Sequence, residues 1–325
     1  MPRSSTRDRA DPLAVRDAIA RRDAAKVLPS VRYPHRLEQD YQRRLLAYVA
    51  RLDVTSKLLA VLKRLGPGID QRHDEQVAAN RSEGAKKAAR TRRADSAATD
   101  TRALLRVVRG AAVQAKAAGV PSSLGPGYQG RVVRAADGQA TAQIDQAVKE
   151  VTRVAVFHDA LEDELFRGYA RENVNLIKSL SQDYFVDLER DISTALREGK
   201  NTRELVKQIQ STTGATKSRA ELIARDQIGK LNGQINEARQ TELGLTKYQW
   251  STSGDERVRS SHASLEGSIQ EWSSPPVESA GGARNHPGEA ISCRCTAEPV
   301  LDDDNIEELI AAGEERKSVA AMRRA

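Results

Sequence analysis

The residues with the greatest capacity for chemistry lie close together in the C-terminal third of this chain. Four candidate metal ligands, His262, His286, Cys293 and Cys295, fall within 34 residues, although the 325-residue chain has only 5 His and 2 Cys. Zinc in structural sites binds four nitrogen or sulfur ligands in a tetrahedron. These residue types therefore indicate a structural zinc site, which would stabilise a loop-rich segment that has few apolar residues.

Two other interpretations of the same residues stay open. The Cys-x-Cys spacing is tighter than the roughly two to four residues that usually separate zinc-binding cysteines. The cysteines can instead be small buried apolar residues, with His286 hydrogen-bonded in a turn before Pro287-Gly288. A disulfide between Cys293 and Cys295 is the third interpretation, but it would be strained, and two cysteines do not form a disulfide framework.

A hydrolytic function is the main catalytic alternative. An acid, a histidine and a metal are the minimum for a metal-dependent nuclease, and Asp255, His262 and His286 could supply it. However, Cys-rich zinc sites are usually closed and structural. We expect Asp255 to form a salt bridge or a cap, with Arg257 and Arg259 as candidate partners. Because the sequence also has no phosphate-binding glycine loop and no nucleophile elbow, we expect a non-enzymatic protein.

The segment around these residues carries an ordered series of short motifs. In chain order the series is Tyr248 and Trp250, then Asp255, Arg257 and Arg259, then His262, Gly267, Pro275-Pro276, His286-Pro287-Gly288 and Cys293-Arg294-Cys295. With these gaps it resembles the C-terminal domain of phage Mu F-like minor head proteins, also called phage head morphogenesis proteins. The resemblance extends upstream to about residue 200 and departs from the family pattern at Asp226-Gln227.

The resemblance implies a minor capsid protein of a bacteriophage virion. Such proteins associate with the portal protein inside the capsid, near the portal vertex, and act in head assembly, DNA packaging or DNA delivery. The major capsid protein or a scaffold protein would be a further partner. We expect synthesis in the host cytoplasm and no membrane partner, because no apolar run approaches the ~18–20 residues that span a bilayer and the N-terminus has no signal-peptide pattern.

Charge is distributed unevenly along the chain. Residues 1–140 contain 28 Lys and Arg against 14 Asp and Glu, whereas residues 141–325 contain 24 against 31. The basic half could contact double-stranded DNA without sequence preference, since Lys and Arg contacts to phosphate release counterions. A solvated arginine-rich helical surface explains the same composition, and a plain DNA-binding module is the remaining alternative function.

Composition and periodicity predict a mainly α fold. Aromatic residues make up 4% of the chain, so we expect a thin core of long helices that forms an elongated N-terminal and middle region. A small α+β domain, with Trp250 and Trp272 in its core, should follow. The predicted regions are a disordered N-terminus (1–12), a basic helical region (13–130), a long-helix region (131–199), the Mu F-like domain (200–301) and a helix with a charged tail (302–325).

Individual elements follow from breakers and caps. We expect helices over 13–28, from 34 to a stop at Gly66-Pro67-Gly68, over 102–118, over 141–196, from 202, and over 216–243. Residues 70–101 should be a solvated helix or a flexible segment, and residues 121–130 a loop. Strands are expected over 246–252 and 295–301, a short helix over 255–265, and a last helix over 305–312.

Overall fold

The computed structural model describes residues 31–79 and 86–312, except 154, 157, 159–162, 256, 280, 303 and 304. The predicted N-terminal segment, the helix over 13–28 and the tail from residue 313 lie outside the described residues. The mainly α prediction is confirmed. The long helices are α2 (His35–Leu52), α3 (Thr55–Ala79), α4 (Lys86–Ala118), α5 (Pro126–Thr152), α6 (Asp163–Arg197) and α7 (Thr202–Glu242).

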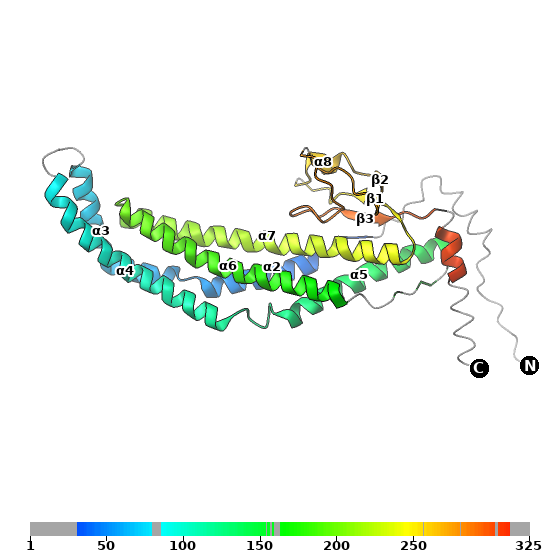
Figure 1. The fold of residues 1–325 in the computed structure, drawn as a ribbon, viewed down its shortest axis with the longest axis horizontal. Coiled ribbons are helices and arrows are strands. Elements are labelled where there is room, and N and C mark those ends of the chain that lie inside the picture. The colour runs from blue at the N-terminus through cyan, green and yellow to red at the C-terminus, as the bar shows by residue number, and fades with distance from the viewer. Residues whose placement is uncertain are drawn as a thin grey trace, which may run out of the picture. The chain divides into compact units, whose positions relative to one another are not determined.

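The small elements follow α7. They are β1 (Lys247–Ser251), α8 (Ser260–Ala263), β2 (Ile269–Glu271) and β3 (Thr296–Pro299), and residues 305–312 are helical again. The strands form an antiparallel sheet in the order β2-β1-β3. Sheet and α8 gather beside the C-terminal part of α7 (Figure 1). Strand β2 was not predicted, and the predicted helix over 255–265 is reduced to α8. Within the described residues no helix is long and apolar enough to cross a bilayer.

The predicted helix from residue 34 is wrong in two respects. The predicted helix from residue 34 breaks at residue 53, where Asp53 Oδ1 accepts a hydrogen bond from the Thr55 N–H at 2.8 Å and so caps α3. After the break Leu58 is fully buried, whereas its neighbour Leu59 is only partly buried. Helix α3 then continues through Gly66-Pro67-Gly68, where Thr202 donates to the Gly66 carbonyl at 3.4 Å.

The predicted helix over 141–196 is two helices. Helix α5 begins earlier, at Pro126, inside the predicted loop, because proline has the φ angle and the missing N–H that suit a first helical turn. It ends at Thr152, and Arg153 has a positive φ of 58°. By contrast, two helices were predicted where the structure has one: the helix that begins at 202 and the helix over 216–243 are both part of α7. The reciprocal bonds between Asn201 and Glu204 form a capping box at the predicted start.

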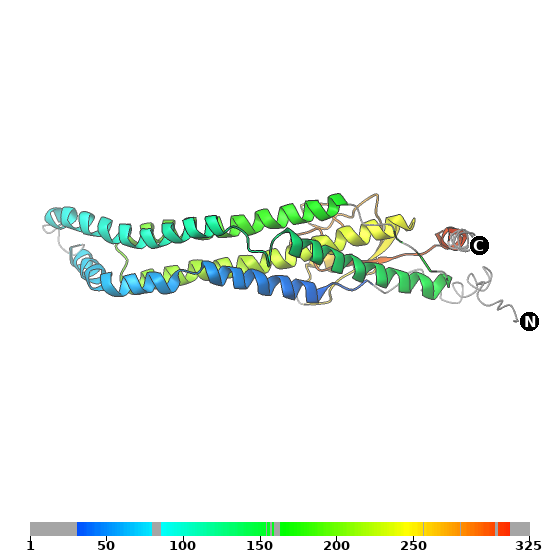
Figure 2. The ribbon, with the colours of Figure 1, turned by 90° about the horizontal axis from the view of Figure 1, so that it is seen from below.

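The chain divides into two compact units. Unit 1 comprises residues 1–39, 130–169 and 225–325, and unit 2 comprises residues 40–129 and 170–224. Within unit 2, α3 and α4 lie side by side (Figure 2). The core of unit 2 includes the fully buried Tyr41, whose hydroxyl donates to Asn173 Oδ1 at 2.6 Å.

Two apolar clusters lie among the described residues of unit 1. One packs α5 residues Ile144 and Val148 against Leu245, Leu301 and residues of the helix over 305–312. The other, which we call the aromatic cluster, consists of Tyr248, Trp250, Trp272, Cys293, Cys295 and Ala297. Tyr248 and Trp250 alternate along β1 and are completely buried, as expected for side chains on one face of a strand.

Candidate metal centre

Three of the four predicted ligands meet at the edge of the aromatic cluster, where His262 contacts its two cysteines. His262 Nδ1 lies 3.6 Å from Cys293 Sγ and 3.5 Å from Cys295 Sγ, and all three side chains are buried. In a zinc tetrahedron with Zn–S of about 2.3 Å and Zn–N of about 2.0–2.1 Å, sulfur and nitrogen are separated by about 3.6 Å. The spacing and chemistry of this ligand group therefore fit a zinc ion.

His286 is not part of the ligand group. Its Nδ1 lies 2.8 Å from the Tyr248 hydroxyl, and its ring contacts Tyr248 edge-on and Trp272 at a tilt. Burial raises the pKa of Tyr248, so the phenol stays protonated and its hydroxyl can donate to Nδ1. His286 thus orders the aromatic cluster, in agreement with the alternative in which it is a turn residue. In the part of the chain that the structure describes, no fourth His, Cys or carboxylate joins the other three.

A carboxylate that sequence reasoning missed orients His262. Glu278 Oε2 lies 2.6 Å from His262 Nε2 and accepts a hydrogen bond from its N–H, so that Nδ1 faces the two sulfurs. Asn285 holds the other oxygen of Glu278 at 2.9 Å. Burial of Glu278 opposes ionisation, but the bonds from His262 and Asn285 outweigh it and lower the pKa of this carboxyl. Metal-binding histidines commonly have such a carboxylate on their second nitrogen.

The two cysteines differ in protonation. The pKa of Cys293 is lowered, mainly because the Cys295 thiol donates to its sulfur, and His262 and the N–H groups of Gly288 and Cys295 add to this. The pKa of Cys295 is raised by the same bond and by burial. The hydrogen bond to Cys293 in turn raises the pKa of His262. Zinc requires both thiolates and a neutral Nδ1, so its binding here would release protons.

The loop that carries the cysteines rests directly on α7. A Cβ atom on Gly229 would lie 2.5 Å from the Cys293 carbonyl oxygen, and one on Gly233 would lie 2.6 Å from that of Pro287. A Cβ atom on Gly288, which has a φ of 94°, would lie 2.5 Å from the Gly229 carbonyl oxygen. Gly229 and Gly233 are one helical turn apart on α7. Because they have no side chains, the loop packs directly on the helix backbone there, and we call this pair the glycine seat. A glycine pair four residues apart within a predicted helix was the available sequence signal.

Arg294, between the two cysteines, is an ion-pair centre. Its guanidinium donates to both oxygens of Glu38, at 2.7 and 3.1 Å, and to Asp255 Oδ2 at 3.2 Å. Asp255 also accepts the Arg257 N–H at 3.0 Å. Asp255 therefore forms a salt bridge, as predicted, and a turn. Its salt-bridge partner is Arg294, whereas the predicted candidates were Arg257 and Arg259. Arg259 instead donates to the Ile291 carbonyl at 2.7 Å.

One further motif residue, Gly267, and Gln240 of α7 shape the sheet. Gly267 has a φ of 74° and donates its N–H to the Trp250 carbonyl, so it provides a turn that a side chain would strain. Gln240 of α7 donates to the Ala297 carbonyl at 2.8 Å and accepts from the Trp272 indole at 3.3 Å. His158 lies away from the centre, between Asp145 and Glu242.

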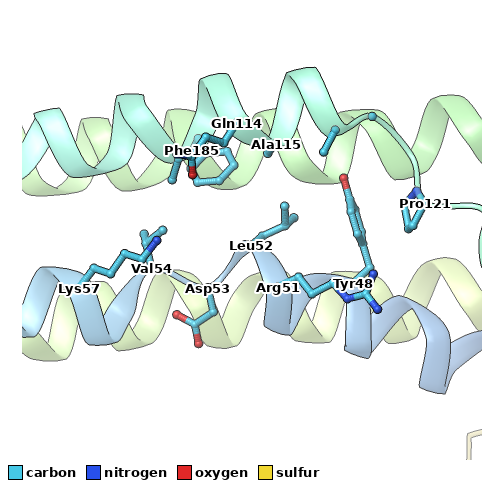
Figure 3. Close-up of a pocket in the computed structure, with 13 residues that line it drawn as sticks. Tyr48, Arg51, Leu52, Asp53, Val54, Lys57, Gln114, Ala115, Pro121 and Phe185 are labelled. Atoms are coloured by element: carbon cyan, nitrogen blue, oxygen red, sulfur yellow. The ribbon is translucent and has the colours of Figure 1, made fainter.

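Each unit contains a cavity. The cavity of unit 2, of about 260 Å³, lies where Tyr48 and Leu52 of α2 reach toward Ala115 and Pro121 (Figure 3). No ligand group of His, Cys and acidic residues is among its lining residues. The cavity of unit 1, of about 170 Å³, opens directly onto His262, Cys293 and Cys295. The second cavity is therefore the one associated with chemically active side chains.

Comparison with known proteins agrees with the motif series. Residues 186–298 match the model of a family described as Phage Mu protein F like protein. An uncharacterized protein of Haemophilus influenzae is 41% identical over 132 residues, which cover 41% of this chain and 28% of that protein. This chain therefore spans well under half of that relative's length. No solved structure matches. The match runs from α6 through the ligand group to β3, so residues 186–298 are similar to proteins of the Phage Mu protein F like family.

Proposed function

We propose that this chain is a minor head protein of a phage, associated with the portal and acting in head assembly and in DNA packaging or delivery. The family match over residues 186–298 carries this proposal, because it contains the complete ligand group and the helix on which that group rests. The proposed location is the capsid interior near the portal vertex. The basic residues of the region 1–140 are suited to contact the packaged DNA there.

In this proposal the metal centre has a structural role. The aromatic cluster is small, and long loops connect its strands, so apolar burial alone contributes little to its stability. His262, Cys293 and Cys295 would hold zinc, which links α8 to the loop before β3 and supplies folding free energy there. A well-ordered domain of this kind could present a fixed surface to the portal or to a capsid or scaffold protein.

The geometry gives less support to the nuclease alternative. That function needs Asp255 and His286 beside a metal on His262. Asp255 instead pairs with Arg294, and His286 bonds to Tyr248. His262→Ala separates the two functions, since loss of a structural ligand lowers the melting temperature, whereas loss of a catalytic residue abolishes DNA cleavage with the fold intact.

The test is incorporation into heads. The full chain would be co-expressed with the portal protein and, separately, with the complete set of head genes. We expect the chain to co-purify with the portal and to be detected in purified heads by mass spectrometry. A folded chain that does not bind the portal and is absent from heads would contradict the proposal. Arg284→Gln is the control for His262→Ala, because Arg284 is exposed, is not part of the ligand group and donates to the Pro275 carbonyl.

A further inference from the structure

Among the described residues, four arginines and one carboxylate line the unit 1 cavity beside the ligand group. They come from three separate segments: Arg225 from α7, Asp255, Arg257 and Arg259 from the loop before α8, and Arg294 from the loop before β3. The cavity volume of about 170 Å³ is well above the ~10–15 Å³ that one water requires. The positive charge and the volume together suit a small anion.

Two buried donors in this cavity lack acceptors. Arg225 Nε and Ser292 Oγ have no hydrogen-bond partner within the described residues. Glu38 Oε1 is 3.7 Å from Arg225 Nε, which is too far for a hydrogen bond, and Glu38 is already bonded to Arg294. A buried donor without an acceptor is costly, so these two donors favour a ligand that accepts hydrogen bonds.

The backbone holds Ser292 in an unusual conformation. Its φ of 57° is in the left-handed region, which costs conformational energy in a residue other than glycine. The Ser292 N–H donates to Asp226 Oδ1 at 3.1 Å and fixes this conformation. The serine is therefore held at the cavity by bonds that do not satisfy its hydroxyl.

We propose that this cavity is a binding site for a phosphate group. Arg225, Ser292 and the guanidinium groups of Arg257 and Arg259 would contact it. Donors on three segments suit a tetrahedral oxyanion better than a planar carboxylate, whose two oxygens lie in one plane. His262, Cys293 and Cys295 line the same cavity, and the phosphate group would lie beside the coordination position that these three ligands leave open. The site follows from the cavity geometry and does not rest on the head function proposed above.

The phosphate can be free in solution or part of a nucleic-acid backbone, and the experiment separates these sources. Calorimetric titration of the full chain with inorganic phosphate at constant ionic strength should show saturable binding, with acetate binding more weakly. Ser292→Ala and Arg225→Lys should each weaken phosphate binding about tenfold, because each removes a charge-assisted hydrogen bond. Arg284→Gln, which removes a charge in unit 1 outside the cavity lining, should leave the binding unchanged.

A short DNA duplex is the second arm. If it displaces bound phosphate and the same two variants weaken this competition, the ligand is a backbone phosphodiester; if it does not compete, the site takes free phosphate. Thermal melting would first establish that the variants are folded. If Arg225→Lys does not fold, Ser292→Ala is the decisive variant. The proposal is overturned if phosphate does not bind, if Ser292→Ala binds phosphate like the wild type, or if Arg284→Gln weakens binding as much.

Discussion

Glu278 holds His262 through Nε2, so that the opposite nitrogen of the ring, Nδ1, is the one that faces Cys293 and Cys295. This relationship fixes both the ring orientation and the tautomer, because a proton on Nε2 leaves Nδ1 as the electron-pair donor. Glu278 is itself buried and held by Asn285. The ligand group is therefore positioned before a metal binds.

Replacing this carboxylate should weaken metal binding without removing a ligand. In Glu278→Gln the amide still fills the space and its oxygen can accept from the imidazole N–H, but the negative charge that strengthens this hydrogen bond is lost. We expect zinc affinity to fall about 10–100-fold, measured by competition with a chromophoric chelator. Exposed Glu271 of β2 provides the control in Glu271→Gln. Equal affinities for Glu278→Gln and wild type would mean that this carboxylate does not support a metal ligand.

Removing a sulfur ligand should show whether metal stabilises the fold. We expect about one equivalent of zinc in the full chain by elemental analysis. A ligand present at about 1,000 times its Kd adds about 4 kcal/mol to the free energy of unfolding, so a chelator should lower the melting temperature of the wild type. Cys293→Ser should lower it similarly, and chelator should then have little further effect. If the protein contains no metal and Cys293→Ser has the same melting temperature as the wild type, the cysteines are buried apolar residues and His286 is a hydrogen-bonded turn residue.

The ionised Asp255 carboxylate should contribute to the free energy of unfolding at neutral pH but not in strong acid. Burial opposes its ionisation, but the Arg257 N–H and the Arg294 guanidinium outweigh burial and lower its pKa. The contribution is complete above the unfolded pKa, about 3.9, and is lost as the pH falls through the lower folded value. It should be small, because the Asp255 side chain is 31% exposed.

The measurement is the free energy of unfolding between neutral pH and pH values below 4, for wild type and Asp255→Asn. The wild type should be more stable at neutral pH, and the difference should shrink toward zero in acid. Both proteins should carry Cys293→Ser and Cys295→Ser, so that proton-driven metal release does not contribute. A difference that is constant with pH would show that Asp255 acts through packing and not through charge.

Periodicity and caps predicted most of the helices and the position of the site. The capping box at Asn201 and Glu204 and the positive φ at Gly199 and Gly244 follow from local preferences, which sequence expresses directly. The continuation of α3 through Pro67 could not be predicted in the same way. It depends on contacts with Thr202, which is far away in the sequence, and such tertiary contacts override local propensity.

The site was predicted by residue type but not by geometry. His262, Cys293 and Cys295 are uncommon residues in a short segment, so composition alone singles them out. Nothing local distinguishes His286 from His262 as a ligand, because the difference lies in their partners Tyr248 and Glu278. Arg225 and Ser292 carry no motif that marks a cavity, and only the fold places their donors together.

The glycine seat on α7 gives the sharpest structural prediction. In Gly229→Ala the new methyl group would lie 2.5 Å from the Cys293 carbonyl oxygen, which is backbone and cannot rotate away. The cysteine loop must shift, and we expect a loss of about 1–3 kcal/mol in stability, as for other overpacked sites, together with weaker zinc binding. Gly214→Ala is the matched control on the same helix, because nothing lies within 4 Å of a Cβ there. It should instead stabilise the chain by about 0.5–1 kcal/mol, since alanine is the better helix former. Equal effects of the two substitutions in denaturant unfolding would show that the loop does not rest on Gly229.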